Sequence, residues 1–219
     1  MKKKIFPGIT LLGVYEPCHC GSYVLHSEDE AFILEMPPCR SKFRSPWKDA
    51  KIFLERNQLK LKGLLLSHAH RDHTASYPKF RRTFPNAPLY YHSSFGNEFG
   101  LGRSEVVFSS PLLELSLGDE KLIILHAPKH SHQDLLVIFR GCICSGDWSM
   151  GYAAECNDIV STETKLRSLA FVKRYLRETN YIVHSSYSAH ANEFYRGMDF
   201  EAKLEAMEAY CLDSLPKAA

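Results

Sequence analysis

The segment LLLSHAHRDHTASYP, residues 64–78, gathers three histidines and an aspartate between His68 and His73. An apolar run comes directly before them, so we expect the segment to be the loop that leaves a buried strand. Alternate side chains of an extended loop point the same way, which lets His68 and His70 grip one metal ion while Asp72 and His73 face a neighbouring one. Imidazole and carboxylate ligands suit zinc, and manganese and iron accept them as well. The segment therefore predicts one side of a site for two divalent ions, most readily Zn²⁺, rather than a loop of merely hydrogen-bonded histidines.

Three later segments place further ligands where a predicted strand ends. APKHSHQD follows the apolar run KLIILH, CSGDW ends the run that begins at Gly141, and His184 ends the run YIV. Loops that leave strands at the same edge of a sheet lie close together. These segments can therefore complete the site that the histidine-rich loop begins.

Two of these segments offer a choice of histidine. In APKHSHQD, His130 competes with His132, and the register of the preceding strand favours His130. VHSSYSAHAN carries both His184 and His190. We expect His184 to be the ligand because it directly ends the predicted strand, which leaves His190 unbound beside the site.

Hydrophobic patterns predict the elements that position these loops. The first third of the chain reads as short strands separated by turn-forming residues, residues 47–59 as a helix, and the middle of the chain as a second series of strands. Residues 161–179 and 200–215 have the periodicity of amphipathic helices. This order predicts an α/β protein in which two sheets pack face to face with helices outside, a four-layer αββα sandwich. Because no linker, repeat or low-complexity tract interrupts the chain, we expect one domain over residues 1–219.

Composition bounds the class of protein. A chain of 219 residues with 45% hydrophobic content can bury one sizeable core. Its formal charge, 27 − 25 = +2, is too near neutrality to indicate a nucleic acid or an acidic membrane as an obligatory partner. The start, MKKKIFPGITLLG, has a short, broken apolar stretch and no signal-peptide cleavage site, and no apolar run is long enough to span a bilayer. We expect a cytoplasmic protein with no membrane partner, while composition leaves the substrate and the oligomeric state open.

The seven cysteines do not have the spacing of a disulfide scaffold, so we expect reduced thiols. Cys18 and Cys20 flank a histidine but lack the second pair that structural zinc sites use, which favours a loop or strand-edge role. Trp148 either walls a substrate pocket or packs in the core. Residues expected to have structural roles are His19, His26, His92, Cys142 and Cys144.

Taken in order, the ligand motifs resemble those of the metallo-β-lactamase superfamily. His68-x-His70-x-Asp72-His73 is the most specific of them, and GSYVL with AFILEMPP is similar to the opening hairpin of that family. The similarity runs from about residue 9 to residue 190. It implies the αββα fold and a dinuclear site in which His68, His70 and His130 hold one ion, Asp72, His73 and His184 hold the other, and Asp147 of the Gly146-Asp147 pair bridges them.

The resemblance also implies hydrolysis. Two ions at such a site would lower the pKa of a bridging water enough to supply hydroxide near neutral pH, and would stabilise developing negative charge. Asp72 would position the hydroxide as well as bind metal, and His190 would donate a proton to the leaving group. Relatives usually have an aspartate where this chain has Glu35, which could still accept a hydrogen bond from a ligand histidine. No serine or cysteine nucleophile is required.

The substrate is less determined, since relatives with this ligand set cleave β-lactams, thioesters, lactones and phosphodiesters. SHAHRDHTASYP and YSAHANEF are similar to segments of the β-CASP nucleases, which favours a phosphodiester or another small ester. The short stretch between Asp147 and His184 leaves no room for the cap domain of those nucleases, so a nucleic acid is not the favoured partner. Two alternatives stay open: a thioester or lactone hydrolase of the glyoxalase-II-like type, and a non-catalytic metal-binding regulatory module. Arg71, Lys79, Arg81 and Arg82 either add charge for a phosphate or form a solvated helix face.

Overall fold

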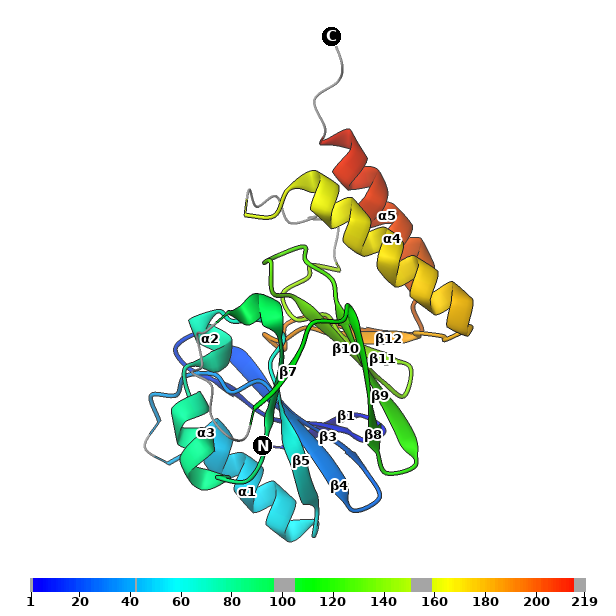
Figure 1. Cartoon of the computed structure of the whole chain (residues 1–219). Helices are drawn as coiled ribbons and strands as arrows, with labels where there is room; N and C mark the ends of the chain where they lie inside the picture. Colours follow the sequence, from blue (N-terminus) through cyan, green and yellow to red (C-terminus); the bar gives the residue numbers. More distant parts are fainter. Residues whose placement is uncertain (1, 42, 97–104, 151–158, 215–219) are drawn as a thin grey trace.

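Two β-sheets lie face to face at the centre of the structure, a computed structural model that describes residues 2–41, 43–96, 105–150 and 159–214. Helices cover both outer surfaces, so the molecule has four layers in the order helix, sheet, sheet, helix (Figure 1). The predicted αββα sandwich is confirmed. One domain over the whole chain stays a prediction.

The first sheet follows chain order from β1 to β7 in the described residues. It is antiparallel from β1 to β4 and parallel from β4 to β7. Its strands are β1 (Lys3–Phe6), β2 (Ile9–Tyr15), β3 (Cys20–Ser27), β4 (Glu30–Leu34), β5 (Lys60–Leu65), β6 (Leu89–His92) and β7 (Glu105–Phe108).

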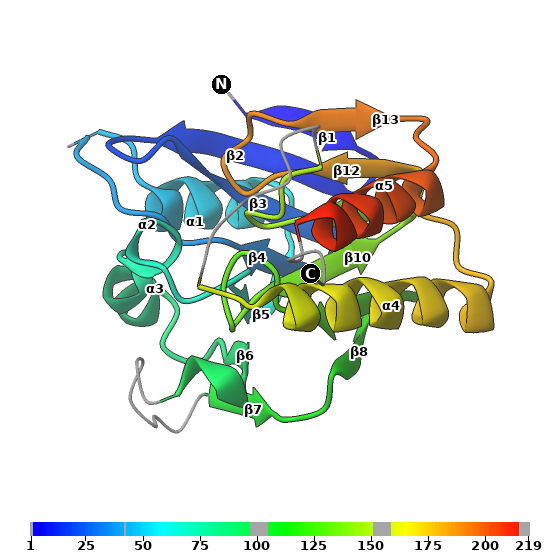
Figure 2. The same ribbon diagram turned by 90° about the horizontal axis from the view of Figure 1, so that it is seen from above.

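The second sheet has the order β13-β12-β11-β10-β9-β8. Only β11 and β12 are parallel neighbours among the described strands of this sheet, and the other neighbours are antiparallel. Its strands are β8 (Leu112–Leu117), β9 (Glu120–His126), β10 (Leu135–Phe139), β11 (Cys142–Cys144), β12 (Ser185–Tyr187) and β13 (Phe194–Arg196). At one edge, β13 lies beside β1 of the first sheet (Figure 2), where Arg196 donates to the carbonyl of Ile5.

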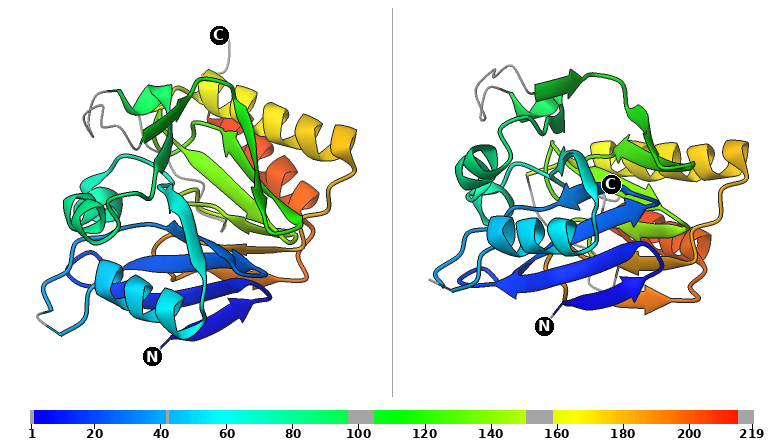
Figure 3. Two further views of the ribbon diagram at one scale, coloured as in Figure 1. Left: turned by 60° about the horizontal axis from the view of Figure 1, so that its bottom comes forward. Right: turned by 90° about the horizontal axis from the view of Figure 1, so that it is seen from below.

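The helices divide between the two outer faces, as both views in Figure 3 show. On the side of the first sheet lie α1 (Pro46–Arg56), α2 (Arg71–Thr74) and α3 (Tyr77–Thr83), and the short 3₁₀ helix η1 (Ser93–Phe95) follows β6. On the side of the second sheet, α4 (Thr162–Thr179) packs along α5 (Phe200–Asp213). Both begin with a side-chain cap, since Ser161 accepts from the Thr164 amide and Asp199 from the Ala202 amide. No helix in the described part of the chain is both long and apolar enough to cross a membrane.

Apolar side chains fill two layers. One lies between the sheets and under α1 and α3, and the other lies between the second sheet and the pair α4 and α5. The run LLVIF of β10 is buried at every position, because both faces of its sheet are covered. Trp148 belongs to the second layer, where its indole N–H donates to the carbonyl of Ala127. Core packing is therefore the role of this tryptophan. Cys142 and Cys144 are buried, as expected.

Two local expectations were wrong, and two edge strands were not foreseen. YIV is not a strand, since β12 begins only at Ser185, and the short edge strands β1 and β13 were not predicted. The histidine-rich loop is extended only as far as His70, which caps α2, and Asp72 and His73 lie within that single helical turn. Asp72 and His73 therefore project from a helical turn rather than from an extended loop, and the ring of His73 lies 4.1 Å from that of His68, measured between centroids.

Candidate metal centre

The loops that follow β5, β9, β11 and β12 converge at one end of the sandwich. The loop after β5 carries His68 and His70, and the loop after β9 carries His130. Asp147 follows β11, and His190 follows β12. Two groups of potential metal ligands result, and both lie in this one place.

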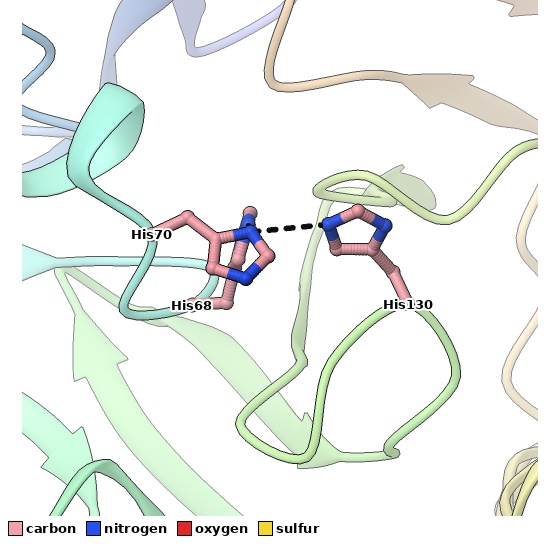
Figure 4. A group of neighbouring side chains, drawn as sticks. All are labelled: His68, His70 and His130. Atoms are coloured by element: carbon pink, nitrogen blue, oxygen red, sulfur yellow. Dashed lines mark hydrogen bonds between the residues drawn. The ribbon is translucent and has the colours of Figure 1, made fainter. Parts of the chain in front are cut away.

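The first group consists of His68, His70 and His130 (Figure 4). Nδ1 of His70 lies 2.9 Å from Nε2 of His68 and 3.2 Å from Nε2 of His130. Nitrogen ligands of a tetrahedral zinc ion lie ~3.3 Å apart, because each Zn–N bond is about 2.0–2.1 Å long. The three imidazoles therefore have the spacing of ligands to one ion.

The second group consists of Asp72, His73, Asp147 and His190. Oδ2 of Asp72 lies 3.4 Å from Nε2 of His73 and 3.4 Å from Nε2 of His190. Oδ2 of Asp147 is also 3.4 Å from each of the same two nitrogens. Two imidazoles thus face two carboxylates, a donor set that suits a divalent cation.

Asp147 also reaches the first group. Its Oδ2 lies 3.8 Å from Nε2 of His68 and 3.7 Å from Nε2 of His130. One carboxylate oxygen therefore stands between the nitrogens of both groups, which is the place that a bridging ligand occupies.

Unsatisfied polar atoms support a fit to metal. Nε2 of His73 and Oδ1 of Asp147 are buried without a hydrogen-bond partner among the described residues. Buried polar groups are seldom left unpaired, because the loss of hydration costs about 1–3 kcal/mol each. Coordination of a cation would satisfy both atoms.

The charge states of the side chains in both groups also suit the binding of a cation. Burial holds the pKa of His68 well below its ordinary value, so this imidazole keeps the lone pair that a ligand needs. The carboxylates of Asp147 and Asp72 raise the pKa of His190 to about 10. His190 and His73 in turn lower the pKa of Asp72 well below its usual range. A cation in the second group would take the place of the protons that these carboxylates attract.

Glu35 lies beside His73 of the second group and at the start of the histidine-rich loop. It follows β4 with a φ of +69°, and its Oε2 lies 3.3 Å from Nδ1 of His73. Its Oε1 accepts the amide N–H of Ser67 at 2.9 Å. Glu35 thus holds the start of the histidine-rich loop and places a carboxylate oxygen beside His73, whereas its expected hydrogen bond from a ligand histidine stays a prediction. Sequence reasoning missed Cys20, whose Sγ lies 3.7 Å from the same Nδ1.

Asp134 shapes the loop that carries His130. Its Oδ2 accepts the amide N–H groups of Lys129, His130 and Ser131 at 2.6–3.0 Å. The loop is also tied to the histidine-rich segment, because the amide of Leu135 donates to the carbonyl of Ser67 at 2.6 Å. The sequence S-x-x-D within the loop was the available signal for this turn, and it went unused. His132, the competitor of His130, is exposed and lies outside both ligand groups.

The loop that carries His190 is fixed by hydroxyl and backbone contacts. Oγ of Ser188 accepts the amides of Asn192 and Glu193, which closes a tight turn around His190. The amide of Ala189 donates to the carbonyl of Gly146, and its carbonyl accepts from Gly21. Nδ1 of His190 then lies 3.1 Å from the carbonyl oxygen of Cys18, so Nε2 is directed at the carboxylates. Cys18 therefore contributes through its backbone, a contact that side-chain patterns do not reveal.

His184 lies at the other end of β12, outside both groups of potential ligands among the described residues. Its amide donates to the carbonyl of Gly141, the residue before β11, whereas Asp147 comes after β11. Its Nδ1 is 2.9 Å from Oγ of Ser185. His190, which the sequence suggested as an unbound proton donor, instead lies in the second group beside Asp72 and Asp147.

Two solved structures have the same architecture over nearly the whole chain. The DIM-1 metallo-β-lactamase is 15% identical, with a TM-score of 0.72 over 98% of each chain. The metallo-β-lactamase from Pontibacter korlensis is 11% identical, with a TM-score of 0.72 over 98% of this chain and 99% of that one. At these identities the comparison establishes the fold alone.

A family model described as the metallo-beta-lactamase superfamily matches residues 41–143, which include the histidine-rich loop and His130. The chain is thus similar to the metallo-β-lactamase superfamily in sequence over this range, and its fold is that of the two metallo-β-lactamases. Among curated relatives, hydroxyacylglutathione hydrolase 1 of Vibrio vulnificus is 30% identical to this chain over 141 residues. That match covers 64% of this chain and 50% of the relative. The chain thus spans about half the length of this relative.

Proposed function

We propose that the protein is a dinuclear metal-dependent hydrolase. The observation that carries the proposal is the position of Asp147, whose Oδ2 lies within 3.4–3.8 Å of nitrogens from both ligand groups. A carboxylate in this position suits two cations that share one ligand, most readily Zn²⁺, with Mn²⁺ or Fe as alternatives. The ligands would be His68, His70 and His130 in one group and Asp72, His73 and His190 in the other, with Asp147 between them.

Bound ions would lower the pKa of a water held between them and polarise the carbonyl or phosphoryl oxygen of a substrate. The residues of the chain would orient the reactants. Asp72 is 30% exposed and its pKa is lowered, so its carboxylate stays ionised and can accept a hydrogen bond that orients the attacking water. Glu35, Asp134 and Ser188 fix the ligand loops, which keeps the groups in place before the substrate arrives.

Small thioesters are the substrate class that we propose first. Support comes from the relatives named hydroxyacylglutathione hydrolase in Vibrio vulnificus and Francisella tularensis, which this chain matches over 50% and 41% of their lengths. In the segment YSAHANEF, which resembles a phosphate-contacting segment of the β-CASP nucleases, His190 lies within the second group. As a proposed metal ligand, His190 is then not a separate contact for a phosphate. Arg81 donates to the carbonyls of Pro85 and Ala87, which occupies one of the basic side chains that favoured a phosphodiester.

The test is a panel assay on metal-loaded protein. We expect turnover of a hydroxyacylglutathione thioester, little or no turnover of bis-p-nitrophenyl phosphate, and loss of activity after chelation. His68→Ala removes one buried proposed ligand, so it should abolish turnover. Circular dichroism should show that this variant stays folded, so that the loss is due to the metal centre. Activity only on the phosphodiester would redirect the substrate class. Full metal binding without turnover of any ester, thioester, lactone or phosphodiester would favour a metal-binding regulatory module.

A further inference from the structure

A second cluster of histidines lies between the two sheets, outside both ligand groups. His92 ends β6 of the first sheet and His126 ends β9 of the second, and their rings stack with centroids 3.6 Å apart and planes 17° apart. Oγ of Ser94 lies 2.8 Å from Nδ1 of His92 and 3.2 Å from Nε2 of His126. The proposed hydrolysis assigns no role to these three residues.

Hydrogen-bond directions in this cluster can be assigned from the backbone partners. Nε2 of His126 lies 2.9 Å from the carbonyl oxygen of His132, which only accepts, so this nitrogen carries the hydrogen. Nδ1 of His92 accepts the amide N–H of Ser94 at 3.1 Å, so it is the acceptor for the Ser94 hydroxyl as well. One set of tautomers therefore satisfies the cluster with both imidazoles neutral. Burial lowers the pKa of both rings, in agreement with this state.

The acceptor of His126 belongs to the loop that presents His130. Asp134 holds the amides on the inner side of this loop, and Ser168 donates to the carbonyl of Pro128. The carbonyl of His132 lies two positions after the ligand, and the side chain of His132 is exposed. His126 therefore holds the loop at the carbonyl of His132, whereas Asp134 holds it at the amides of residues 129–131.

We propose that His126 is a positioning residue for the metal centre. Its Nε2–H group holds the carbonyl of His132, and this contact keeps His130 directed at His68 and His70. Ser94 and His92 keep His126 in place and in the required tautomer, so the end of β6 in one sheet stabilises a ligand loop of the other. This inference rests on the proposed function, because it assumes that His130 binds metal.

Two substitutions separate the hydrogen bond from the shape of the ring. His126→Gln keeps an N–H donor at the position of Nε2, whereas His126→Phe keeps a flat ring against His92 but removes the donor. Zinc affinity, measured by competition with a chromogenic chelator, is the readout. We expect wild-type protein and His126→Gln to bind two equivalents with similar affinity. We expect His126→Phe to bind one equivalent about tenfold more weakly and the other unchanged. His132→Ala is the matched control, since only the backbone of that residue takes part, and it should bind zinc like the wild type.

Several results would overturn the inference. Wild-type zinc affinity in His126→Phe would show that the N–H donor is not needed. If His126→Gln and His126→Phe both bound zinc more weakly and to the same extent, the N–H donor could not be the cause. Equal weakening of both equivalents would indicate general damage to the fold. If the wild-type protein binds two ions and hydrolyses a substrate while His126→Phe binds normally, this inference alone fails. A wild-type protein that binds no zinc would overturn the proposed function, and this inference with it.

Discussion

Nε2 of His190 lies 3.4 Å from Oδ2 of Asp147, and the two residues follow the parallel neighbours β12 and β11. Because the strands are parallel, the loops after them leave at the same end of the sheet. His184 comes before β12 and lies beside Gly141, at the opposite end. The boundary of one short strand thus decides which histidine reaches the metal centre.

This relationship predicts different results for two alanine variants. His190→Ala removes a side chain that faces Asp72 and Asp147, so we expect it to lower bound zinc by one equivalent and turnover by at least about 100-fold. His184→Ala removes an exposed side chain and should retain both equivalents and full activity. Metal analysis after gel filtration, with turnover measured on the same samples, compares them. The opposite pattern would restore His184 as the ligand.

The backbone of Gly21 lies so close to the carbonyl of Ala189 that a side chain at position 21 should destabilise the fold. A Cβ added there would lie 2.9 Å from the carbonyl oxygen of Ala189, the residue directly before His190. We expect Gly21→Ala to lower the free energy of unfolding by about 1–3 kcal/mol, measured by urea denaturation, and to weaken zinc binding. Ser22→Ala is the control, because it removes a buried hydroxyl that has no hydrogen-bond partner among the described residues and should not destabilise the fold. Unchanged stability in Gly21→Ala would contradict this packing.

The stacked pair His92 and His126 predicts a dependence of stability on pH. Burial holds the pKa of both imidazoles below the ordinary value of 6.5, so the unfolded chain binds more protons than the folded chain as the pH falls through this range. The contribution of the pair is therefore present above pH 6.5 and is lost as the pH falls through the lowered pKa values. The ring of His126 adds to the lowering of the pKa of His92, and a backbone hydrogen bond with Ser109 opposes it. For His126, the backbone hydrogen bond with His132 and the charge of Asp134 oppose the lowering.

Urea unfolding of chelator-treated protein at pH 7.5 and pH 5.5 measures this effect. Ligand histidines titrate in the same interval, so the relevant quantity is the difference between wild-type protein and His126→Phe. We expect the variant to lose less stability than the wild type on acidification. An equal or larger loss in the variant would contradict neutral stacking of the two rings.

Local patterns were sufficient for the parts of the site that lie within one segment. The ligands from His68 to His73 stand next to a buried strand, so their types and spacing reveal both the chemistry and the element that delivers it. The four layers also follow from the alternation of strand and helix patterns. His190 could not be chosen in this way, because the apolar run YIV resembles a strand while the polar SSY forms one beside β11. The pairing partner decides there, and local hydrophobicity does not report it.

Backbone contacts account for most of what the sequence did not reveal. The carbonyl of Cys18 orients His190, the carbonyl of His132 binds His126, and the amide of Ser67 binds Glu35. Every residue has such groups, so no residue type signals their use. They become visible only when distant loops are placed together.

Zinc titration of wild-type protein and Asp147→Ala tests the shared two-metal centre most directly. We predict two equivalents in the wild type and weakened binding of both equivalents in the variant, because Oδ2 of Asp147 reaches both ligand groups. Circular dichroism should show the variant to be folded. One equivalent or none in the wild type, or two equivalents at wild-type affinity in Asp147→Ala, would contradict the account.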